Sequence, residues 1–486
     1  MILINPKSTK FGIFQRYVPL SVPIGLGYLA AYLLMNGRKA EVVDEHIDPL
    51  SRQLVNSLLE NLSPPYIFGI STLTACAQRS YEIAGRIKDW YPDSIIILGG
   101  IHPTVLPEEA LGNTAVDFVV RGEGEEILLE LYDAIKNRKD HSRIKGLSYK
   151  NGSKLIHNPP AELPVLEDFP PFPYHLFEKG LGKYNFSFIS SSRGCPYDCI
   201  FCSQRSISGK RFRYVPESVV LDQIELLVNK YEQGHINFVD DNFTADKQRV
   251  IRLCRGIREK GLQKKASFDC QTRADAVDDE LLISLKSSGF RMINYGLETA
   301  SERLMVLLNK KETVAENIAA VKLTKKYGFG VSGTFIFGLP TETREERWKA
   351  YKLAKELDLD YVRFNNPTPY PGTKLYEIAK SEGRLFVEEG WANLNACASL
   401  VQDSLAESRL PYLPQGCEEN ELKRDIIRAN LFFSLRPMKV FKLLVKRIGP
   451  AGWFYLPPRW YLNPEEWWGL VKLGSSLLRS LAKIYL

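Results

Sequence analysis

Short hydrophobic runs alternate with amphipathic stretches along the first 141 residues. The runs occur in "MILINP", "AEVVD", "YIFGIS", "SIIILGG" and "DFVVRGEG", and each has the length of a buried strand. The stretches between them have helical periodicity, as in residues 77–90. Buried strands separated by helices predict an α/β domain with a doubly wound, flavodoxin-like parallel sheet. Such a sheet binds ligands at the carboxyl ends of its strands.

This pattern stops at about residue 142, and a second one begins near residue 183. Residues 142–182 are rich in proline and lack periodicity, so we expect a linker that lies over a surface. Beyond it, strand-like and helical stretches alternate again and predict a partial (β/α)6 barrel over residues 183–399, with its chemistry at the strand carboxyl ends. The expected strands are Phe186–Ser191, Ile236–Asp240, Ser267–Cys270, Met292–Tyr295, Val331–Phe337 and Tyr361–Asn365.

The last segment, residues 400–486, has a different composition. Four of the seven tryptophans lie within Trp453–Trp468, and the net charge of +7 arises entirely after residue 429. Two interpretations fit this basic, aromatic, helical region. It packs against the barrel, or it contacts a membrane surface or a lipid-like substrate. Apolar residues outnumber charges in it, so nucleic acid is not an expected partner.

The chain has the features of a cytoplasmic protein. No apolar run is long enough to span a membrane, and the basic residues of "MILINPKSTK" follow the apolar ones, the reverse of a secretory signal. The basic C-terminal region leaves a peripheral membrane position open. Eight cysteines in a reducing compartment are more typical of metal binding than of disulfides.

Three of the cysteines lie in "RGCPYDCIFCS", with the spacing C-x3-C-x2-C. Cys195, Cys199 and Cys202 follow the first expected barrel strand. A structural zinc site needs four ligands, and the other cysteines form no second pair at ligand spacing. Three thiolates on one loop can instead bind three irons of a 4Fe–4S cluster, which leaves the fourth iron open to another molecule.

The motif C-x3-C-x-aromatic-C at this place resembles the signature of the radical S-adenosylmethionine (SAM) superfamily, and the resemblance covers roughly residues 184–383. It implies that Cys195, Cys199 and Cys202 bind the cluster. It also implies that the open iron binds the amino and carboxylate groups of SAM, which the reduced cluster cleaves to a 5′-deoxyadenosyl radical. In this resemblance Phe201 lies against the adenine.

Polar residues after later strands agree with the resemblance. "INFVDDNFT" places Asp240, Asp241 and Asn242 where acceptors for the SAM ammonium are expected. Arg273 in "FDCQTRAD" suits the SAM carboxylate, and Glu298 in "NYGLETAS" suits the ribose hydroxyls. Rim polar residues or helix caps would look the same in sequence, so these roles are implied by the resemblance alone. The sequence assigns no catalytic residue beyond cofactor binding.

A doubly wound domain before such a barrel resembles the cobalamin-binding class of this superfamily. Ser71 and Leu73 form an S-x-L element, and Gly99 and Gly100 form a G-G element; in cobalamin domains these accommodate the nucleotide tail. The D-x-H-x-x-G loop, whose histidine coordinates cobalt, is missing after the first strand, so the lower cobalt ligand stays open. A plain nucleotide-binding fold is the rival, supported only by an isolated G-x-G.

Together, the resemblances imply an enzyme with a 4Fe–4S cluster, SAM and cobalamin, reduced by an external donor of the flavodoxin or ferredoxin type. We expect it to methylate an unactivated carbon of a lipid-like or secondary-metabolite substrate. One alternative is oxidative cyclisation or rearrangement without methyl transfer, as in the anaerobic magnesium-protoporphyrin ester cyclase. A second alternative is a non-catalytic iron–sulfur or corrinoid carrier. The polar residues at the strand ends argue against a carrier, which needs no SAM site.

Overall fold

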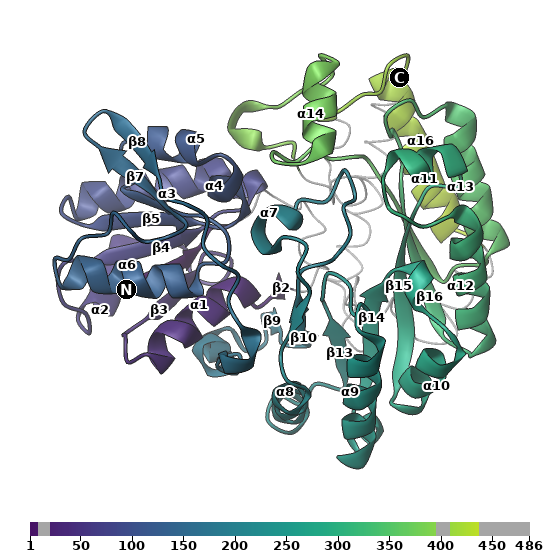
Figure 1. Cartoon of the computed structure of the whole chain (residues 1–486), viewed down its shortest axis with the longest axis horizontal. Helices are drawn as coiled ribbons and strands as arrows, with labels where there is room; N and C mark the ends of the chain where they lie inside the picture. The colour runs from purple at the N-terminus through teal and green to yellow at the C-terminus, as the bar shows by residue number, and fades with distance from the viewer. Residues whose placement is uncertain (8–19, 395–408, 437–486) are drawn as a thin grey trace, which may run out of the picture.

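A computed structural model describes residues 1–7, 20–394 and 409–436 of the chain. Two α/β units lie side by side, the first drawn in purple and blue and the second in teal and green (Figure 1). Strand β2 (Leu20–Ser21) pairs with β9 (Tyr184–Asn185), so backbone hydrogen bonds join the two units. The tryptophan-rich stretch Trp453–Trp468 and the rest of the basic tail beyond residue 436 lie outside the described residues.

The first unit contains a seven-stranded sheet whose first five strands are parallel, in the order β3-β1-β4-β5-β6. The order reverses between β1 and β4, which is where a doubly wound sheet opens a crevice for a ligand. This confirms the predicted flavodoxin-like sheet. The five strands are β1 (Ile2–Asn5), β3 (Glu41–Asp44), β4 (Ile67–Ser71), β5 (Ile95–Gly99) and β6 (Phe118–Val120).

The two faces of this sheet follow from alternation along its strands. In β1, Ile2 and Ile4 belong to a core with helices α2 (Arg52–Leu59) and α3 (Ala77–Trp90). Leu3 points to the other face, into a second core with α1 (Ile24–Met35) and α6 (Glu125–Lys136). Helices therefore cover both faces, as a parallel sheet requires.

The first sheet continues past residue 141, where the sequence predicted a linker. Strands β7 (Leu147–Asn151) and β8 (Lys154–His157) pair antiparallel with β6 and with each other. Asn151 and Gly152 turn the hairpin, and Gly152 has a φ of +60°. An Asn-Gly pair is a strong hairpin signal, but the prolines that follow obscured it.

The second unit is an open barrel of six parallel strands that pair in chain order. Among the described residues its first and last strands do not pair with each other, so the barrel is partial, as predicted. Its large aromatic core includes Phe238, Phe268, Phe290 and Phe335. The strands are β10 (Phe188–Ile189), β13 (His235–Phe238), β14 (Ser267–Thr272), β15 (Phe290–Glu298), β16 (Gly330–Ile336) and β17 (Tyr361–Asn365).

Helices connect successive barrel strands and complete each βα unit. Side-chain caps mark the N-terminal ends of most of these helices; α12 (Val314–Lys326) and α13 (Arg344–Glu356), for example, both begin with capping boxes. The connecting helices include α8 (Glu217–Asn229), α9 (Lys247–Glu259), α10 (Asp279–Ser287), α12 (Val314–Lys326) and α13 (Arg344–Glu356).

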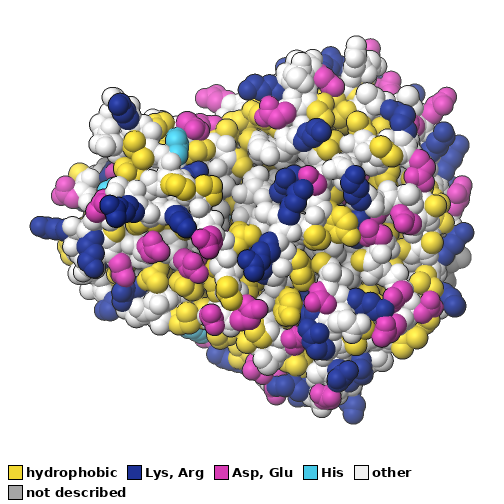
Figure 2. Space-filling model, viewed as in Figure 1, with side chains coloured by type: hydrophobic (Ala, Val, Ile, Leu, Met, Phe, Trp, Pro, Cys, Tyr) yellow, Lys and Arg dark blue, Asp and Glu magenta, His cyan; other side chains and the backbone are white. Residues whose placement is uncertain are grey.

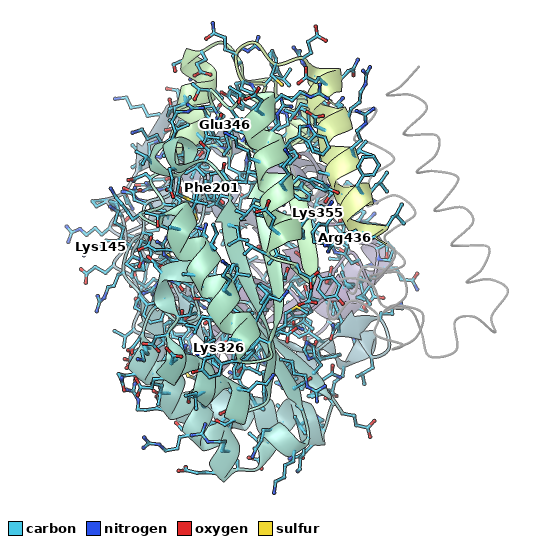
Figure 3. All side chains as sticks on the ribbon, turned by 90° about the vertical axis from the view of Figure 1, so that its right-hand side faces the viewer. Lys145, Phe201, Lys326, Glu346, Lys355 and Arg436 are labelled. Carbon is cyan, nitrogen blue, oxygen red and sulfur yellow. The ribbon has the colours of Figure 1, made fainter. Side chains whose placement is uncertain are left out.

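Helix α16 (Glu419–Ser434) covers the outer edge of β17, beside α13 (Figures 1 and 3). Asn430 replaces the missing neighbour strand. Its side chain accepts a hydrogen bond from Phe364 N at 3.1 Å and donates one to Phe364 O at 2.9 Å. The start of the C-terminal region, residues 419–434, is therefore part of the barrel.

The part of the chain that the structure describes contains no helix of the length and apolarity needed to cross a membrane. Figure 2 shows acidic and basic side chains intermixed over the visible face, with apolar side chains scattered between them.

Candidate active site

The cysteine loop begins directly after β11 (Ser192–Arg193) and ends at α7 (Arg205–Ser208). Gly194 starts the loop with a φ of +83°, and a Cβ there would collide with the backbone of Arg211. Glycine is therefore required for this turn. The loop follows β10, so it lies at the carboxyl end of the barrel sheet, where the sequence placed it.

The three motif cysteines are free and half-buried. Burial raises the pKa of Cys199 to about 12 and raises the pKa of Cys195 and Cys202 as well. Among the described residues, no group of three His, Cys, Asp or Glu side chains lies close enough together to coordinate a single metal ion. In a 4Fe–4S cluster each thiolate binds its own iron, so these three cysteines would supply one ligand to each of three irons.

The loop is held from the barrel side by two carboxylates that follow β13. Asp240 Oδ1 accepts hydrogen bonds from Ser191 N at 3.1 Å, from Ser191 Oγ at 2.9 Å and from Ser192 Oγ. Asp241 accepts one from Gly194 N at 3.0 Å. Both predicted residues therefore lie against the cysteine loop, and their bonds fix the backbone that precedes Cys195.

Asn242, the third polar residue of this group, lies next to the cluster motif. Its Oδ1 accepts a hydrogen bond from Thr272 Oγ1 at 3.1 Å, and its buried Nδ2 has no partner among the described residues. A buried donor without a partner is a group that a ligand can satisfy.

The predicted residues Arg273 and Glu298 are joined by a row of alternating charges. Lys310 Nζ lies 3.2 Å from Glu298 Oε1 and 3.1 Å from Glu312 Oε2. Glu312 Oε1 lies 3.4 Å from Arg273 Nε, which also donates to Asp275 Oδ1 at 2.9 Å. The row presents both signs of charge at the ends of β14 and β15. A zwitterionic ligand such as the amino-acid end of SAM requires such a surface.

The Arg273 guanidinium also contacts the cysteine loop. Its central carbon lies 3.3 Å from the ring centroid of Tyr197, which stands between Cys195 and Cys199. Sequence reasoning missed Lys310 and Glu312. Both side chains are buried at the site. They lie in the connection between α11 (Glu302–Leu307) and α12, and no local pattern marks that connection as part of the site.

Phe201, within the cysteine motif, is half-buried and belongs to a small apolar cluster (Figure 3). A flat, apolar ring could pack on this surface, in agreement with the expected adenine contact. The other members are Ile200, Leu304, Leu307, Leu308, Ile336, Leu339 and Ile378.

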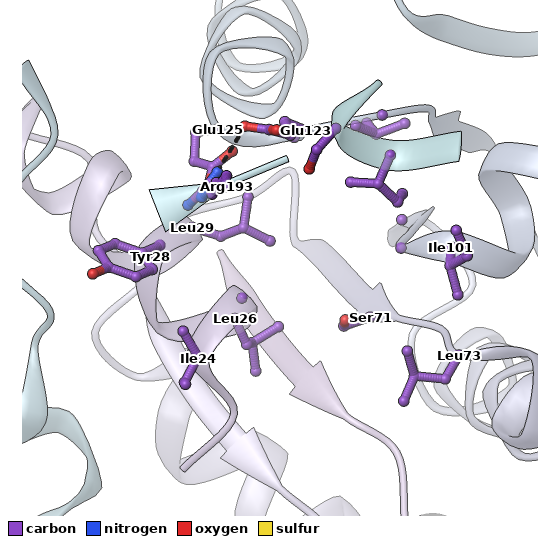
Figure 4. A pocket seen from close by; sticks show the side chains of 18 of the residues that line it. Ile24, Leu26, Tyr28, Leu29, Ser71, Leu73, Ile101, Glu123, Glu125 and Arg193 are labelled. Atoms are coloured by element: carbon purple, nitrogen blue, oxygen red, sulfur yellow. Dashed lines mark hydrogen bonds and ion pairs between the residues drawn. The ribbon is translucent and has the colours of Figure 1, made fainter. Parts of the chain in front are cut away.

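A cavity of about 500 Å³ lies between the two units, and both units line it (Figure 4). The structure brings all four predicted cobalamin residues to its wall: Ser71 and Leu73 at the end of β4, and Gly99 and Gly100 at the end of β5. The cavity therefore opens at the carboxyl ends of β4 and β5, the edge of the sheet where a doubly wound fold binds ligands.

The chemistry of this cavity fits a cobalamin. Its wall is mainly apolar, with Ile24, Leu26 and Leu29 on α1 (Figure 4). Leu73 is 59% exposed at this wall, and an exposed large apolar side chain there is one that an apolar ligand can cover. Gly100 has a φ of +101°, and a Cβ there would lie 2.7 Å from Thr72 O.

Among the described residues that line the cavity there is no histidine, cysteine, methionine or lysine. The described part of the wall thus offers none of the usual nitrogen or sulfur ligands of cobalt, consistent with the missing D-x-H-x-x-G loop. His46, the nearest approach to that motif in sequence, donates its backbone N–H to Asp44 Oδ1 at 3.0 Å and is not part of the wall.

The barrel unit contributes a set of polar groups to the cavity that sequence reasoning missed. The sequence placed the cobalamin site wholly within the first domain, because local patterns do not show how two domains meet. The added residues are Ser190, Ser192, Arg193, Ser203, Gln204 and Ser208, together with Asp241, which the sequence assigned to the SAM site only. Serine hydroxyls and the glutamine amide suit the amide side chains at the corrin periphery.

Two known sequence families match this chain. Residues 189–354 match the Radical SAM superfamily, and residues 16–132 match the B12 binding domain. An uncharacterized methyltransferase of Pyrococcus horikoshii is 34% identical over 364 residues, 74% of this chain and 78% of that protein. The anaerobic magnesium-protoporphyrin IX monomethyl ester cyclase of Rubrivivax gelatinosus is 28% identical over 374 residues, 73% of this chain and 66% of that protein.

The fold is similar to that of a solved structure, the radical S-adenosylmethionine methyltransferase TsrM of Kitasatospora setae with tryptophan and a SAM analogue bound. The two share a TM-score of 0.67 and 21% identity, over 79% of this chain and 77% of TsrM. The similarity confirms the arrangement of a doubly wound domain beside a partial barrel.

Proposed function

This chain belongs to the radical SAM superfamily and carries a B12-binding domain, and on that premise we propose that it methylates an unactivated carbon of a lipid-like or secondary-metabolite substrate. It is a radical SAM enzyme, and its cofactors are a 4Fe–4S cluster, SAM and cobalamin. When bound, these cofactors supply hydrogen abstraction from an unreactive C–H bond and a methyl group for the carbon so activated.

The observation that carries the proposal is the shared wall of the cavity. Arg193 and Asp241 line it from the barrel side, and the cysteine motif begins at Cys195, only two residues after Arg193. One loop therefore borders both cofactor sites. A substrate carbon at this loop would be within reach of both cofactors. A methylation that uses both cofactors requires this proximity.

The roles proposed for the chain's own residues follow from their contacts. Cys195, Cys199 and Cys202 would hold the cluster, with Phe201 against the adenine. The charged row from Glu298 to Arg273, together with the unpartnered amide of Asn242, would orient the polar groups of SAM. Asp240 and Asp241 would keep the cysteine loop in place.

The substrate class is inferred from the apolar character of the site and the composition of the chain. Apolar side chains such as Leu73 and Val239 are exposed at the cavity wall. The basic, aromatic tail, which lies outside the described residues, would suit a peripheral contact with a membrane. The required electron donor would be a separate protein of the flavodoxin or ferredoxin type.

A second candidate function is oxidative cyclisation without methyl transfer. The supporting observation is the 28% identity with the anaerobic magnesium-protoporphyrin IX monomethyl ester cyclase. The described side chains do not separate this function from methylation, because the two reactions differ in the substrate.

The test of the proposal is an anaerobic assay with the full chain, reconstituted with iron, sulfide and hydroxocobalamin. SAM with a deuterated methyl group, a chemical reductant and a membrane-lipid extract are added. Methylation predicts 5′-deoxyadenosine and S-adenosylhomocysteine in step, with a deuterated methyl group in a lipid. Formation of 5′-deoxyadenosine without any labelled lipid would contradict methylation of this pool and favour the cyclase candidate.

Two alanine variants accompany this assay. Cys199→Ala removes one proposed cluster ligand and is expected to lower both products at least 100-fold, with loss of bound iron. Cys417→Ala, which removes a half-buried free cysteine outside the motif, serves as the matched control and is expected to retain both products.

A further inference from the structure

Four charged side chains join the two units, and three of them, Arg193, Glu123 and Glu125, line the cavity. Arg193 Nη1 donates to Glu123 Oε2 at 2.9 Å, and its Nη2 donates to Glu125 Oε1 at 2.7 Å. Arg213 donates to the same Glu123 through Nη1 at 3.0 Å and also through Nη2. The two glutamates are only 3% and 4% exposed, so water competes little for these bonds. We call these four residues the interdomain latch.

The two halves of the latch come from different units. Arg193 and Arg213 face each other across the antiparallel pair β11 and β12 (Arg213–Tyr214) in the barrel unit. Glu123 and Glu125 stand where β6 gives way to α6 in the first unit. The latch is therefore a direct, charge-assisted connection between the cysteine loop and the cobalamin domain.

The surroundings fix the Arg193 guanidinium in one orientation. It lies 5.3 Å from the ring centroid of Tyr28 and 5.1 Å from that of Phe169, close enough for cation–π attraction. Figure 4 shows Arg193, Glu123, Glu125 and Tyr28 together at the edge of the cavity. Because both arms of the fork are used, the arginine cannot turn without breaking a bond to a buried carboxylate.

The cysteine loop is thus held from two sides. Gly194 N–H is bound to Asp241 of the barrel, and the adjacent Arg193 is bound to Glu123 and Glu125 of the first unit. Buried ion pairs often add little to stability compared with apolar contacts, whereas their directional bonds can select one arrangement among several. A selective role is what a loop shared by two cofactor sites would need.

We propose that the interdomain latch is a positioning device that fixes the cysteine loop against the cobalamin cavity and thereby sets the spacing between cluster and cobalamin. Arg193 and Glu125 are its central positioning residues and act through the loop. The inference rests on the cofactor assignment and is independent of which carbon is methylated.

The test uses Glu125→Gln, which keeps the shape of the side chain and removes its charge, in the full chain. Glu126→Gln, at the exposed neighbouring position on α6, is the matched control. The first readout is the dipolar coupling between the reduced cluster and cob(II)alamin, measured by pulsed electron paramagnetic resonance. The second is the dissociation constant of hydroxocobalamin.

For Glu125→Gln we expect a broader distribution of cluster–cobalt distances and an approximately tenfold rise in the dissociation constant, the size typical for loss of a hydrogen bond to a charged group. Iron content should stay at the wild-type level, and Glu126→Gln should match the wild type throughout. A Glu125→Gln protein with the wild-type distance distribution and affinity would overturn the proposal.

Two further variants separate positioning from a general loss of folding. Arg193→Lys keeps the charge but cannot bridge both glutamates, so it should fold and still broaden the distances. The double variant Arg193→Gln/Glu125→Gln leaves no unpaired charge at the Arg193–Glu125 contact. Its distance distribution and its dissociation constant for hydroxocobalamin should be no worse than those of Arg193→Gln. Strictly additive losses would show that the two residues act separately and would overturn the latch.

A readout without either cofactor completes the test. In the cofactor-free protein, amide hydrogen exchange at residues 192–194 should be faster in Glu125→Gln than in Glu126→Gln. The reason is that the loop has lost the ion pair between Arg193 and Glu125 that connects it to the first unit. Equal exchange rates in the two variants would contradict the proposal that this ion pair holds the loop. None of these readouts needs a substrate, so they can succeed or fail independently of the methylation assay.

Discussion

Glu342 illustrates how burial changes the chemistry of a single side chain. It lies after β16 with its side chain 1% exposed, accepts a hydrogen bond from Gly338 N–H, and has Arg347 Nε at 3.9 Å. Burial raises its pKa from the ordinary value of 4.5 to about 8, and the Gly338 bond and the arginine oppose the shift. Below pH 4.5 the carboxyl is protonated in both the folded and the unfolded chain. As the pH rises from 4.5 to 8, only the unfolded chain loses the proton, so stability falls through this window.

The variant Glu342→Gln should remove this pH dependence. Relative to the wild type, its free energy of unfolding should increase by about 2 kcal/mol between pH 6 and pH 8, given about 1.4 kcal/mol per pKa unit. Chemical denaturation at the two pH values measures the difference. Glu345→Gln, at an exposed position on α13, is the control. Equal pH dependence in wild type and Glu342→Gln would refute the assignment.

At the scale of elements, the sequence predicted most of the strands and helices but not all of their pairings. Helix α3 has the predicted bounds, residues 77–90, because its apolar spacing is regular. The hairpin of β7 and β8 was missed within a proline-rich stretch. Helix α16 was expected in a separate region, and its place against β17 depends on the tertiary contact of Asn430 with Phe364, which no local pattern encodes.

Asn430 is therefore expected to make a large contribution to the free energy of unfolding. The variant Asn430→Ala leaves the N–H and C=O of Phe364 without their partner at the sheet edge and should cost about 2–3 kcal/mol of unfolding free energy. Denaturant unfolding followed by tryptophan fluorescence measures this. Asn420→Ala, at an exposed position of the same helix, should change stability by less than about 0.5 kcal/mol. Similar effects of the two variants would contradict the edge-covering role of α16.

At the scale of the whole molecule, the active site is a property of two domains together. The sequence predicted the cluster cysteines, the strand-end polar residues and four cavity residues, because glycine pairs, cysteine spacing and strand ends are local features. It did not predict the serines, Gln204 or Arg193 in the cavity wall, nor Lys310 and Glu312 in the charged row. Those positions become neighbours only when the domains dock or when distant loops meet, and their placement had to come from the structure.

The central claim, that the cavity holds the cobalamin used for methyl transfer, can be tested at Gly99. A Cβ there meets only ordinary contacts, with Val120 O at 3.8 Å and Val120 Cβ at 4.0 Å, so Gly99→Val should fold while narrowing the cavity. Gly234→Val, an exposed position where a Cβ meets nothing within 4 Å, is the matched control.

The most direct measurement is the ratio of transferred methyl groups to 5′-deoxyadenosine in the anaerobic assay, for the wild type and both glycine variants. The account predicts that Gly99→Val binds hydroxocobalamin at least 100-fold more weakly. It should still cleave SAM to 5′-deoxyadenosine and transfer almost no methyl groups, whereas Gly234→Val should behave as the wild type. If Gly99→Val transfers methyl groups at the wild-type ratio, the cavity is not the site of the cobalamin that supplies them.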